Sequence, residues 1–261
     1  MSIKIENTQI FGWEGAIRGA RNPMNSWEKS DTIFKDNYGT YPSYNVNSIV
    51  DFLDPSSPLF SVEEFTKYSI VNAGMHIGPA DHKLLMNLCK GGTEEAKWRR
   101  MVHVQMDITA PLYWWKEFET YKVGTTSNSC STMHKIQAKE FTLDDFSHEH
   151  LGFTIPAELN DGEEIYLNLW PVELDKLIET LNITRARYEQ ADQALKKDYW
   201  WQMIQLLPTS YNQRRTIDLN YEVLASQYRQ RKEHKLDEWH QYCDWIKTLP
   251  YSEFITMEET E

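Results

Sequence analysis

A strict alternation of apolar and polar residues over positions 102–108 constrains the fold more than any other stretch. In the sequence VHVQMDI every second side chain is apolar, which predicts a strand with one face in the core and the other in water. Ala110-Pro111 ends the alternation, and a proline suits the first turn of a helix because its missing N–H needs no partner there. We therefore expect a strand that leads directly into a helix over LYWWKEFETYK, residues 112–122.

Apolar residues with helical spacing account for much of the remaining chain. Residues 3–11 form a second candidate strand, and residues 23–80 are rich in turn formers and prolines. The helices expected cover residues 13–21, 81–92 with Asp81 as cap, 112–122, 172–206, 219–232 and 236–248. We predict the α/β (α+β) class: one helix-rich domain, residues 1–261, around a modest central sheet, with an elaborated 23–80 region and a frayed acidic tail at 256–261.

Charge and cysteine usage limit the classes of partner. The chain has 27 Lys and Arg against 39 Asp and Glu, a formal net charge of −12. This balance disfavours duplex nucleic acid as a partner, although a small basic pocket for one nucleotide is compatible with it. No apolar run approaches the roughly 20 residues that span a bilayer, no secretion signal begins the chain, and three separated cysteines do not suggest disulfides. We expect a soluble, cytoplasmic protein with no membrane partner.

The densest polar cluster is the stretch TTSNSCSTMH at residues 125–134, which follows a glycine. Hydroxyls, an amide and exposed backbone N–H groups in one turn can bind phosphate oxygens. The same composition is also typical of a turn that hydrogen-bonds its own backbone. Cys130 and His134 stand four residues apart and could act as nucleophile and base or as metal ligands, but the spacing identifies no third ligand, so no metal site is predicted.

Arginines and aromatic residues supply further candidates. Asn220 and Arg231 follow the stretch LPTSYN at residues 207–212, and arginines can clamp a phosphate, although most arginines on helices are solvated. Arg18 and Arg21 form a similar pair. The aromatic residues of LYWWKEF could stack on a flat heterocycle or, as we favour, pack in the core. None of the patterns HExxH, GxGxxG and GxxxxGK occurs, so zincin, Rossmann and P-loop chemistry lack support.

Taken in order, these segments resemble the flavin-dependent thymidylate synthases. The likeness begins at the helix 81–92, continues through the strand VHVQMDITAP and the helix LYWWKEFETYK, and reaches the hydroxyl-rich stretch. It resumes at Leu207-Pro208 and runs through Asn220 and Arg231 to the helix near Trp239, so it covers only part of the chain. The resemblance implies an α/β fold, a homotetramer and FAD bound where subunits meet.

The family's signature has the form RHRxxSxNExSxRY, and the comparable stretch here is TYKVGTTSNSCSTMH, residues 120–134, with one inserted residue. At the signature's S, N and S positions stand Thr126, Asn128 and Ser131. Its Glu, Arg and Tyr are replaced by Ser129, Met133 and His134. The RHR element corresponds to Thr120, Tyr121 and Lys122, so only the lysine keeps a positive charge.

The resemblance also implies a reaction and roles for single residues. In the family, dUMP becomes dTMP with carbon from methylenetetrahydrofolate and a hydride from reduced FAD, which NADPH regenerates. Electrostatic stabilisation of the uracil anion and of phosphate is the protein's main contribution. By resemblance Ser131 and Arg231 are catalytic residues that contact dUMP, and Lys122 and Asn220 contact FAD. The further substrate-binding residues would be Glu117, Thr126, Asn128, Ser129 and His134.

Three hypotheses on function remain open at this point. The first is a pyrimidine-nucleotide-binding thymidylate synthase homologue that uses FAD, with Arg99 and Arg100 as replacements for the lost cations. The second is a flavin-free nucleotide-binding or interaction protein on the same scaffold, motivated by the missing RHR, Glu and Arg. The third makes Cys130 a nucleophile toward C6 of a pyrimidine.

Overall fold

The computed structural model describes residues 3–34, 75–152, 155–158, 164–167 and 169–258. Contacts divide the chain into two compact units. The first unit comprises Met1–Lys4, Ile108–Thr120 and Asn128–Arg215, and the second comprises Ile5–Asp107, Tyr121–Ser127 and Thr216–Glu261. Within the elaborated 23–80 region, residues 35–74 lie outside the described residues. The expectation of a single domain over residues 1–261 stays a prediction.

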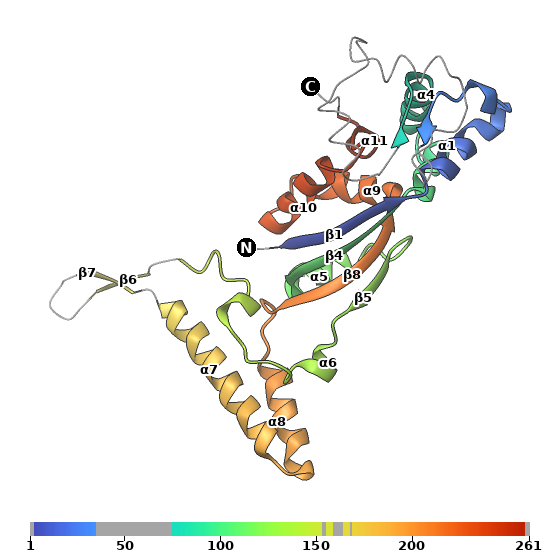
Figure 1. Cartoon of the computed structure of the whole chain (residues 1–261). Coiled ribbons are helices and arrows are strands. Elements are labelled where there is room, and N and C mark those ends of the chain that lie inside the picture. The colour runs from blue at the N-terminus through green and yellow to red at the C-terminus, as the bar shows by residue number, and fades with distance from the viewer. Residues whose placement is uncertain (1–2, 35–74, 153–154, 159–163, 168, 259–261) are drawn as a thin grey trace, which may run out of the picture. The chain divides into compact units, whose positions relative to one another are not determined.

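A four-stranded sheet has the order β1-β4-β8-β5 (Figure 1). Its strands are β1 (Lys4–Phe11), β4 (His103–Pro111), β8 (Asn212–Asn220) and β5 (Thr126–Ser129). β4 and β8 run antiparallel, because Tyr221 donates its N–H to the carbonyl of Val102 while Leu112 donates to that of Tyr211, each at 3.0 Å. The expected class, helix-rich α/β with a modest sheet, is confirmed.

β4 has the alternating burial that its sequence predicts. Its apolar side chains are buried and its polar ones are half-buried. On the polar face Gln105 donates to Asp218 at 2.7 Å, and Thr216 donates to Asp107 at 2.6 Å. The strand prediction is therefore confirmed, and β1 confirms the strand expected at residues 3–11.

The helix after Pro111 is shorter than the sequence predicts. α5 (Leu112–Phe118) follows β4 directly but does not continue to residue 122. The hydroxyl of Thr120 donates to the carbonyl of Glu117 at 2.7 Å, and such a bond offers the backbone an alternative to another helical turn. Lys122 therefore lies beyond the helix.

Three of the four aromatic residues of α5 pack in the core, as favoured above, whereas Tyr113 is half-buried. Trp114, Trp115 and Phe118 are at most 2% exposed. The indole N–H of Trp115 donates to the carbonyl of Gln213 at 2.9 Å, and the guanidinium of Arg215 lies 4.4 Å from its ring centroid. These rings are therefore not available to stack on a ligand.

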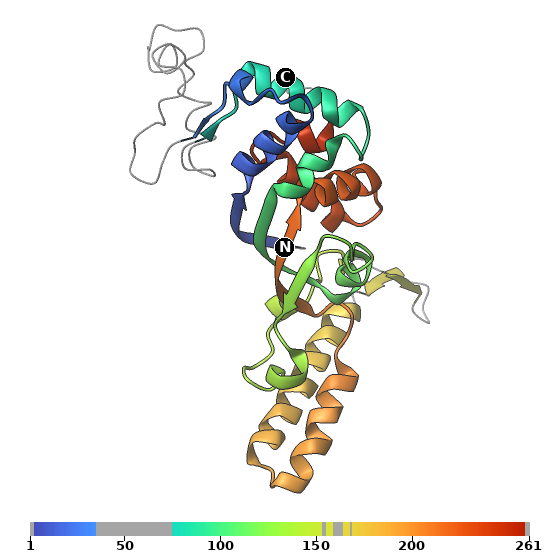
Figure 2. The same ribbon diagram turned by 90° about the vertical axis from the view of Figure 1, so that its right-hand side faces the viewer.

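The first unit also contains a helical hairpin. α7 (Leu169–Gln190) and α8 (Gln193–Leu206) lie side by side in both views (Figure 1, Figure 2), which confirms the helical periodicity over residues 172–206. Asp192 caps α8 by accepting the N–H groups of Ala194 and Leu195, each at 3.0 Å. The remaining elements of the unit are α6 (Thr132–Lys135), the 3-10 helix Leu143–Asp145, and the antiparallel strands β6 (Ile155–Glu158) and β7 (Glu164–Leu167).

The second unit is built around aromatic side chains. Its elements besides the sheet are α1 (Trp13–Arg21), α4 (Pro79–Lys90), α9 (Tyr221–Arg231), α10 (Asp237–Lys247), α11 (Glu253–Thr256), the antiparallel strands β2 (Ile33–Phe34) and β3 (Met75–His76), and the 3-10 helices Asn22–Met24, Trp27–Lys29 and Ala96–Met101. The ring of Trp13 lies 5.1–6.3 Å from those of Trp98, Tyr221, Tyr251 and Phe254, in tilted or edge-on arrangements that favour aromatic contact. None of the described helices combines the length and apolarity that crossing a membrane requires.

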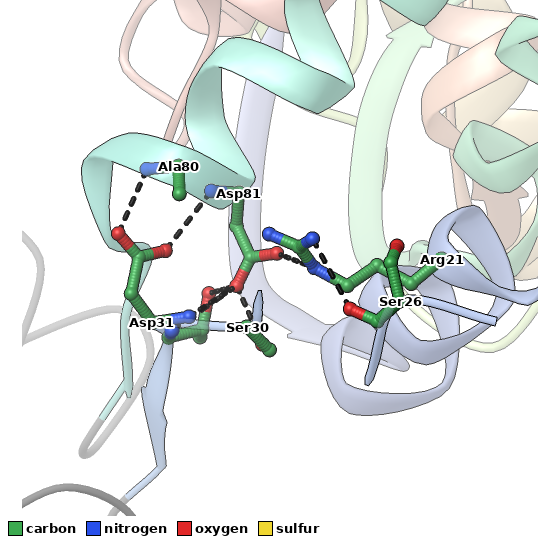
Figure 3. A network of polar contacts seen from close by, with 7 residues as sticks. Arg21, Ser26, Ser30, Asp31, Ala80 and Asp81 are labelled. Carbon is green, nitrogen blue, oxygen red and sulfur yellow. Dashed lines mark hydrogen bonds and ion pairs between the residues drawn. The ribbon is translucent and has the colours of Figure 1, made fainter. Parts of the chain in front are cut away.

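Asp81 does not cap α4, contrary to the expectation. The carboxylate of Asp31 has that role, because it accepts the N–H groups of Ala80 and Asp81 at 2.7 and 2.9 Å. Asp81 is 1% exposed and accepts hydrogen bonds from Arg21 Nε and the Ser30 hydroxyl, each at 2.6 Å (Figure 3). A buried ion pair therefore joins α1 to α4.

The C-terminal end of the described chain makes specific contacts. Of the tail expected over residues 256–261, Thr256 belongs to α11. The carboxylate of Glu258 accepts hydrogen bonds from the Tyr228 hydroxyl at 2.9 and 3.0 Å. Residues 259–261 lie outside the described residues, so fraying there stays a prediction.

Candidate functional site

A cavity of about 220 Å³ lies within the first unit, beside the hydroxyl-rich stretch. Ser131 and Thr132 line it from the start of α6, and Tyr211 and Arg214 line it from the region of β8. Hydroxyl and cationic groups thus share one concave surface, which is the combination that binds phosphate oxygens.

The segment that carries Ser131 is fixed by hydrogen bonds to its neighbours. The N–H of Cys130 donates to the carbonyl of Arg214 at 2.9 Å, and the carbonyl of Cys130 accepts from Gln213 Nε2 at 2.9 Å. Ser131 then caps α6, because its Oγ accepts the N–H of His134 at 3.2 Å. Capping uses the acceptor side of the hydroxyl, so its hydrogen can donate to a ligand.

The charges around the cavity leave an excess of one positive charge. Lys135, Lys139 and Arg214 line it together with Asp144 and Asp145, a formal sum of 3 − 2 = +1. Lys139 and Asp145 form an ion pair. Lys135 has no ion-pair partner among the described residues, and its ammonium is exposed. In a chain with a net charge of −12, this cavity is a favourable place for an anion.

Tyr211 also lines this cavity. Burial, followed by the charge of Asp145 and the thiolate form of Cys130, raises the pKa of Tyr211 to about 12. The hydroxyl therefore stays protonated at neutral pH and can donate a hydrogen bond.

The predicted site residues of the first unit are only partly brought together. Ser131 lines the cavity. Asn128 and Ser129 lie on the exposed strand β5, and His134 is an exposed residue of α6. Glu117 is half-buried in α5. These four are not among the residues that line the cavity, so their substrate-binding roles stay predictions.

The other predicted residues belong to the second unit. Arg231 lies close to the segment that carries Lys122, because its Nε donates to the Tyr121 hydroxyl at 2.9 Å. The guanidinium also lies 4.8 Å from the ring centroid of Trp239. Lys122 itself is exposed, as is Thr126 in β5. The meeting of Ser131 with Lys122 and Arg231 on one ligand stays a prediction.

Asn220, the second residue expected at FAD, has a structural role. It is 8% exposed and caps α9, because its Oδ1 accepts the N–H of Val223 at 3.1 Å. A Cβ on Gly124 would lie 3.2 Å from its Nδ2, so the loop after Lys122 passes directly over the amide. The contact with FAD stays a prediction.

Three of the arginines considered above have partners within the chain, whereas Arg100 is exposed and its role stays a prediction. Arg99 is buried, lies 2.7 Å from the carboxylate of Glu222 and donates to the carbonyl of Phe254 at 3.0 Å. Arg21 is paired with Asp81. Arg18 is exposed and lies 3.6 Å from Glu14 in the next turn. The anion-site interpretation is therefore wrong for Arg21 and Arg99, whose guanidinium groups are buried in ion pairs.

Sequence reasoning missed the cations of the cavity. Lys135 and Lys139 stand four residues apart directly after the hydroxyl-rich stretch, a spacing that could have placed them on one side of a short helix. Tyr211 belongs to the stretch LPTSYN that the sequence already singled out, whereas Arg214 gave no local signal, because it comes from a strand distant in sequence. The pairing of β5 with β8 and the hydrogen bond from the Cys130 N–H to the Arg214 carbonyl bring Arg214 to the segment that carries Ser131.

The three cysteines differ sharply in accessibility. Cys89 and Cys243 are buried, and burial raises the pKa of each thiol to about 11. Cys130 is exposed and lines the cavity. Within the described ranges no three His, Cys, Asp or Glu side chains gather in a way that could hold a metal ion.

Comparison with known proteins identifies the fold. No protein-family model matches the chain, and no curated protein does. Two structures of the flavin-dependent thymidylate synthase ThyX from Helicobacter pylori, both with FAD and dUMP, match 98% of this chain. Their TM-scores are 0.55 and 0.56, at 12% and 11% sequence identity, and 98% and 99% of their own chains are covered. A UMP/dUMP methylase, PolB from Streptomyces cacaoi with 5-Br UMP, matches 69% of this chain and 84% of its own at 14% identity, with a TM-score of 0.45. The fold is therefore that of the thymidylate synthase ThyX.

Proposed function

We propose that this chain is a pyrimidine-nucleotide-binding homologue of the flavin-dependent thymidylate synthases, and that the nucleotide phosphate binds in the cavity beside Ser131. One observation carries the proposal: Ser131 and Thr132, from the hydroxyl-rich stretch that resembles the family's signature, line a cavity with an unpaired lysine, on a chain with the ThyX fold. By resemblance the full reaction converts dUMP to dTMP with methylenetetrahydrofolate, reduced FAD and NADPH, in a homotetramer.

In such a reaction the chain's own residues bind and orient. Lys135 and the Ser131 hydroxyl would hold the phosphate, Lys135 by its charge and Ser131 by donating a hydrogen bond. Arg231, which by resemblance contacts dUMP, is already oriented by Tyr121 and Trp239, and a guanidinium so fixed loses little freedom when it stabilises an anion.

The residues described for one chain fit the diphosphate of FAD poorly. At the positions of the RHR element, the hydroxyl of Thr120 is bonded to Glu117 and that of Tyr121 to Gln230 and Arg231. Lys122 is then the one cation of these three residues, whereas a dinucleotide diphosphate carries two negative charges. These three positions therefore lack the positive charge that a bound diphosphate requires.

This misfit favours the second candidate, a nucleotide-binding protein that has the scaffold without the flavin chemistry. The two candidates predict different absorbance spectra. The catalytic one gives a yellow protein that releases tritium from C5-labelled dUMP when methylenetetrahydrofolate and NADPH are supplied. The other gives a colourless protein that takes up no FAD and still binds dUMP. Flavin absorbance of the purified protein, followed by the tritium assay, decides between them.

Phosphate binding itself is tested at Lys135. Replacement by alanine should weaken dUMP binding tenfold to a hundredfold, since a hydrogen bond to a charged group contributes about 1.5–3 kcal/mol. Calorimetry without FAD measures the affinity, and a saturating nucleotide at 100 times its dissociation constant should add roughly 2.7 kcal/mol to the stability of the wild type. The matched control is Lys197→Ala on α8, an exposed lysine of the same unit that does not line the cavity. Equal losses in both variants, or no stabilisation by any pyrimidine nucleotide, would refute the proposal.

A further inference from the structure

Tyr211 is held rigidly at the edge of the cavity. Its N–H donates to the carbonyl of Pro208 at 3.1 Å, and its carbonyl accepts the N–H of Leu112 at 3.0 Å. Its ring packs against Phe141 and Phe146, with centroids 6.4 and 5.8 Å away. Backbone and ring are therefore fixed by contacts that do not involve the hydroxyl.

The hydroxyl of Tyr211 makes no hydrogen bond to any described residue, although its neighbours in the protein fix every other part of the side chain. Tyr113, also half-buried in this unit, has its hydroxyl 3.0 Å from that of Ser147. A preorganised donor that lines a cavity and has no partner in the chain is a group that a ligand can use at little entropic cost.

The charged groups that line the cavity determine which part of a nucleotide can bind at the Tyr211 hydroxyl. The carboxylate of Asp145 lines the cavity together with Tyr211, where Lys139 pairs with it, and burial together with the charge of Asp145 raises the pKa of Tyr211. A phosphate dianion is disfavoured there, whereas Lys135 offers an unpaired positive charge. A neutral carbonyl oxygen is the acceptor that suits Tyr211.

We propose that the Tyr211 hydroxyl donates a hydrogen bond to a carbonyl oxygen of the pyrimidine base, while the phosphate of the same nucleotide binds at Lys135. The proposal rests on the function proposed above and assigns Tyr211 as a residue that recognises the base. Because the hydroxyl has no bond within the described chain, Tyr211→Phe removes the donor without breaking a contact of the fold.

The test compares two ligands in two tyrosine variants. Tyr211→Phe should raise the dissociation constant of dUMP about twofold to tenfold, the range for one neutral hydrogen bond, and leave that of deoxyribose 5-phosphate unchanged in calorimetry at millimolar concentration. Tyr199→Phe, a half-buried tyrosine of α8 in the same unit, should change neither. Thermal unfolding should show both variants as stable as the wild type.

Three outcomes would overturn the inference. If Tyr211→Phe weakens both ligands equally, the hydroxyl contacts the sugar phosphate and not the base. If it weakens neither, the hydroxyl contacts no ligand. If the wild type binds no dUMP at all, the proposed function fails and the inference fails with it, whereas in the first two outcomes nucleotide binding itself stands.

Discussion

Replacing Gly12 by alanine should lower the free energy of unfolding by about 3 kcal/mol or more, from strain and overpacking together. Gly12 caps α1 with φ at 96°, a conformation that costs an L-residue energy. A Cβ there would overlap the carbonyl oxygen of Met101 and lie 3.2 Å from its carbonyl carbon. The obstacle is backbone, so it cannot rotate away. Chemical denaturation followed by circular dichroism measures the loss.

Alanine variants at two other glycines distinguish the cost of backbone strain from that of the overlap with Met101. Gly92 has the same φ of 96° but open space around its Cβ position, so Gly92→Ala should cost only the strain, about 1–2 kcal/mol. Gly15 lies inside α1, where a Cβ would meet the Met101 methyl at 3.4 Å, and Gly15→Ala should be neutral or stabilise by up to about 1 kcal/mol. If Gly12→Ala cost no more than Gly92→Ala, the overlap with Met101 would be disproved.

Removing the guanidinium of Arg21 should lower the free energy of unfolding by a similar amount. Arg21→Met leaves the buried carboxylate of Asp81 without its cation, and breaking one side of a buried ion pair costs about 3–5 kcal/mol. The matched control is Arg18→Met, one turn earlier on α1, where an exposed pair with Glu14 predicts a change of about 0–1 kcal/mol. Comparable losses in the two variants would mean that the buried pair adds nothing to stability.

The hydrogen bonds and the ion pair of Asp81 also predict how the free energy of unfolding depends on pH. Burial alone would raise the pKa of Asp81, but hydrogen bonds from Ser30, Thr32 and Arg21, with the charge of Arg21, outweigh it and lower the pKa below 3.8. A carboxylate with a lowered pKa in the folded state stabilises the fold fully above its unfolded pKa and loses that contribution as pH falls toward the folded value. The wild type should therefore lose this contribution below about pH 4, and Arg21→Met should show a weaker loss over the same range.

The sequence predicts elements well where local pattern and tertiary environment agree. The alternation of β4 and the periodicity of α7 and α8 are set by which face meets the core, so the pattern records the fold. β8 escaped prediction because its sequence NQRRTIDLN has only Ile217 and Leu219 as apolar residues. Its half-buried Arg215 is covered by Trp115, a contact from another part of the chain. The exposed strand β5 has no apolar residue.

Part of the candidate site could likewise be predicted from the sequence. Ser131 belongs to a local cluster of hydroxyls, which the sequence displays directly. Arg214 reaches the cavity because β8 lies beside β5, and no single segment of a sequence shows which strands become neighbours. Asp81 shows the same limit: its position suggested a helix cap, but Arg21, 60 residues away, gives it a different partner.

The reciprocal hydrogen bonds of Asp31 and Asp81 affect how far the sequence between them can change in length. Asp31 accepts N–H groups at the start of α4, and Asp81 accepts those of Asp31 and Thr32 in return. Hydrogen bonds to these two carboxylates therefore hold the segment before residues 35–74 against the segment after them. Each doubling of the length of a connecting segment costs only about 0.6 kcal/mol in closure entropy. Changes in the number of residues between Thr32 and Ala80 should therefore be tolerated, because the contacts of Asp31 and Asp81 keep α4 packed against α1.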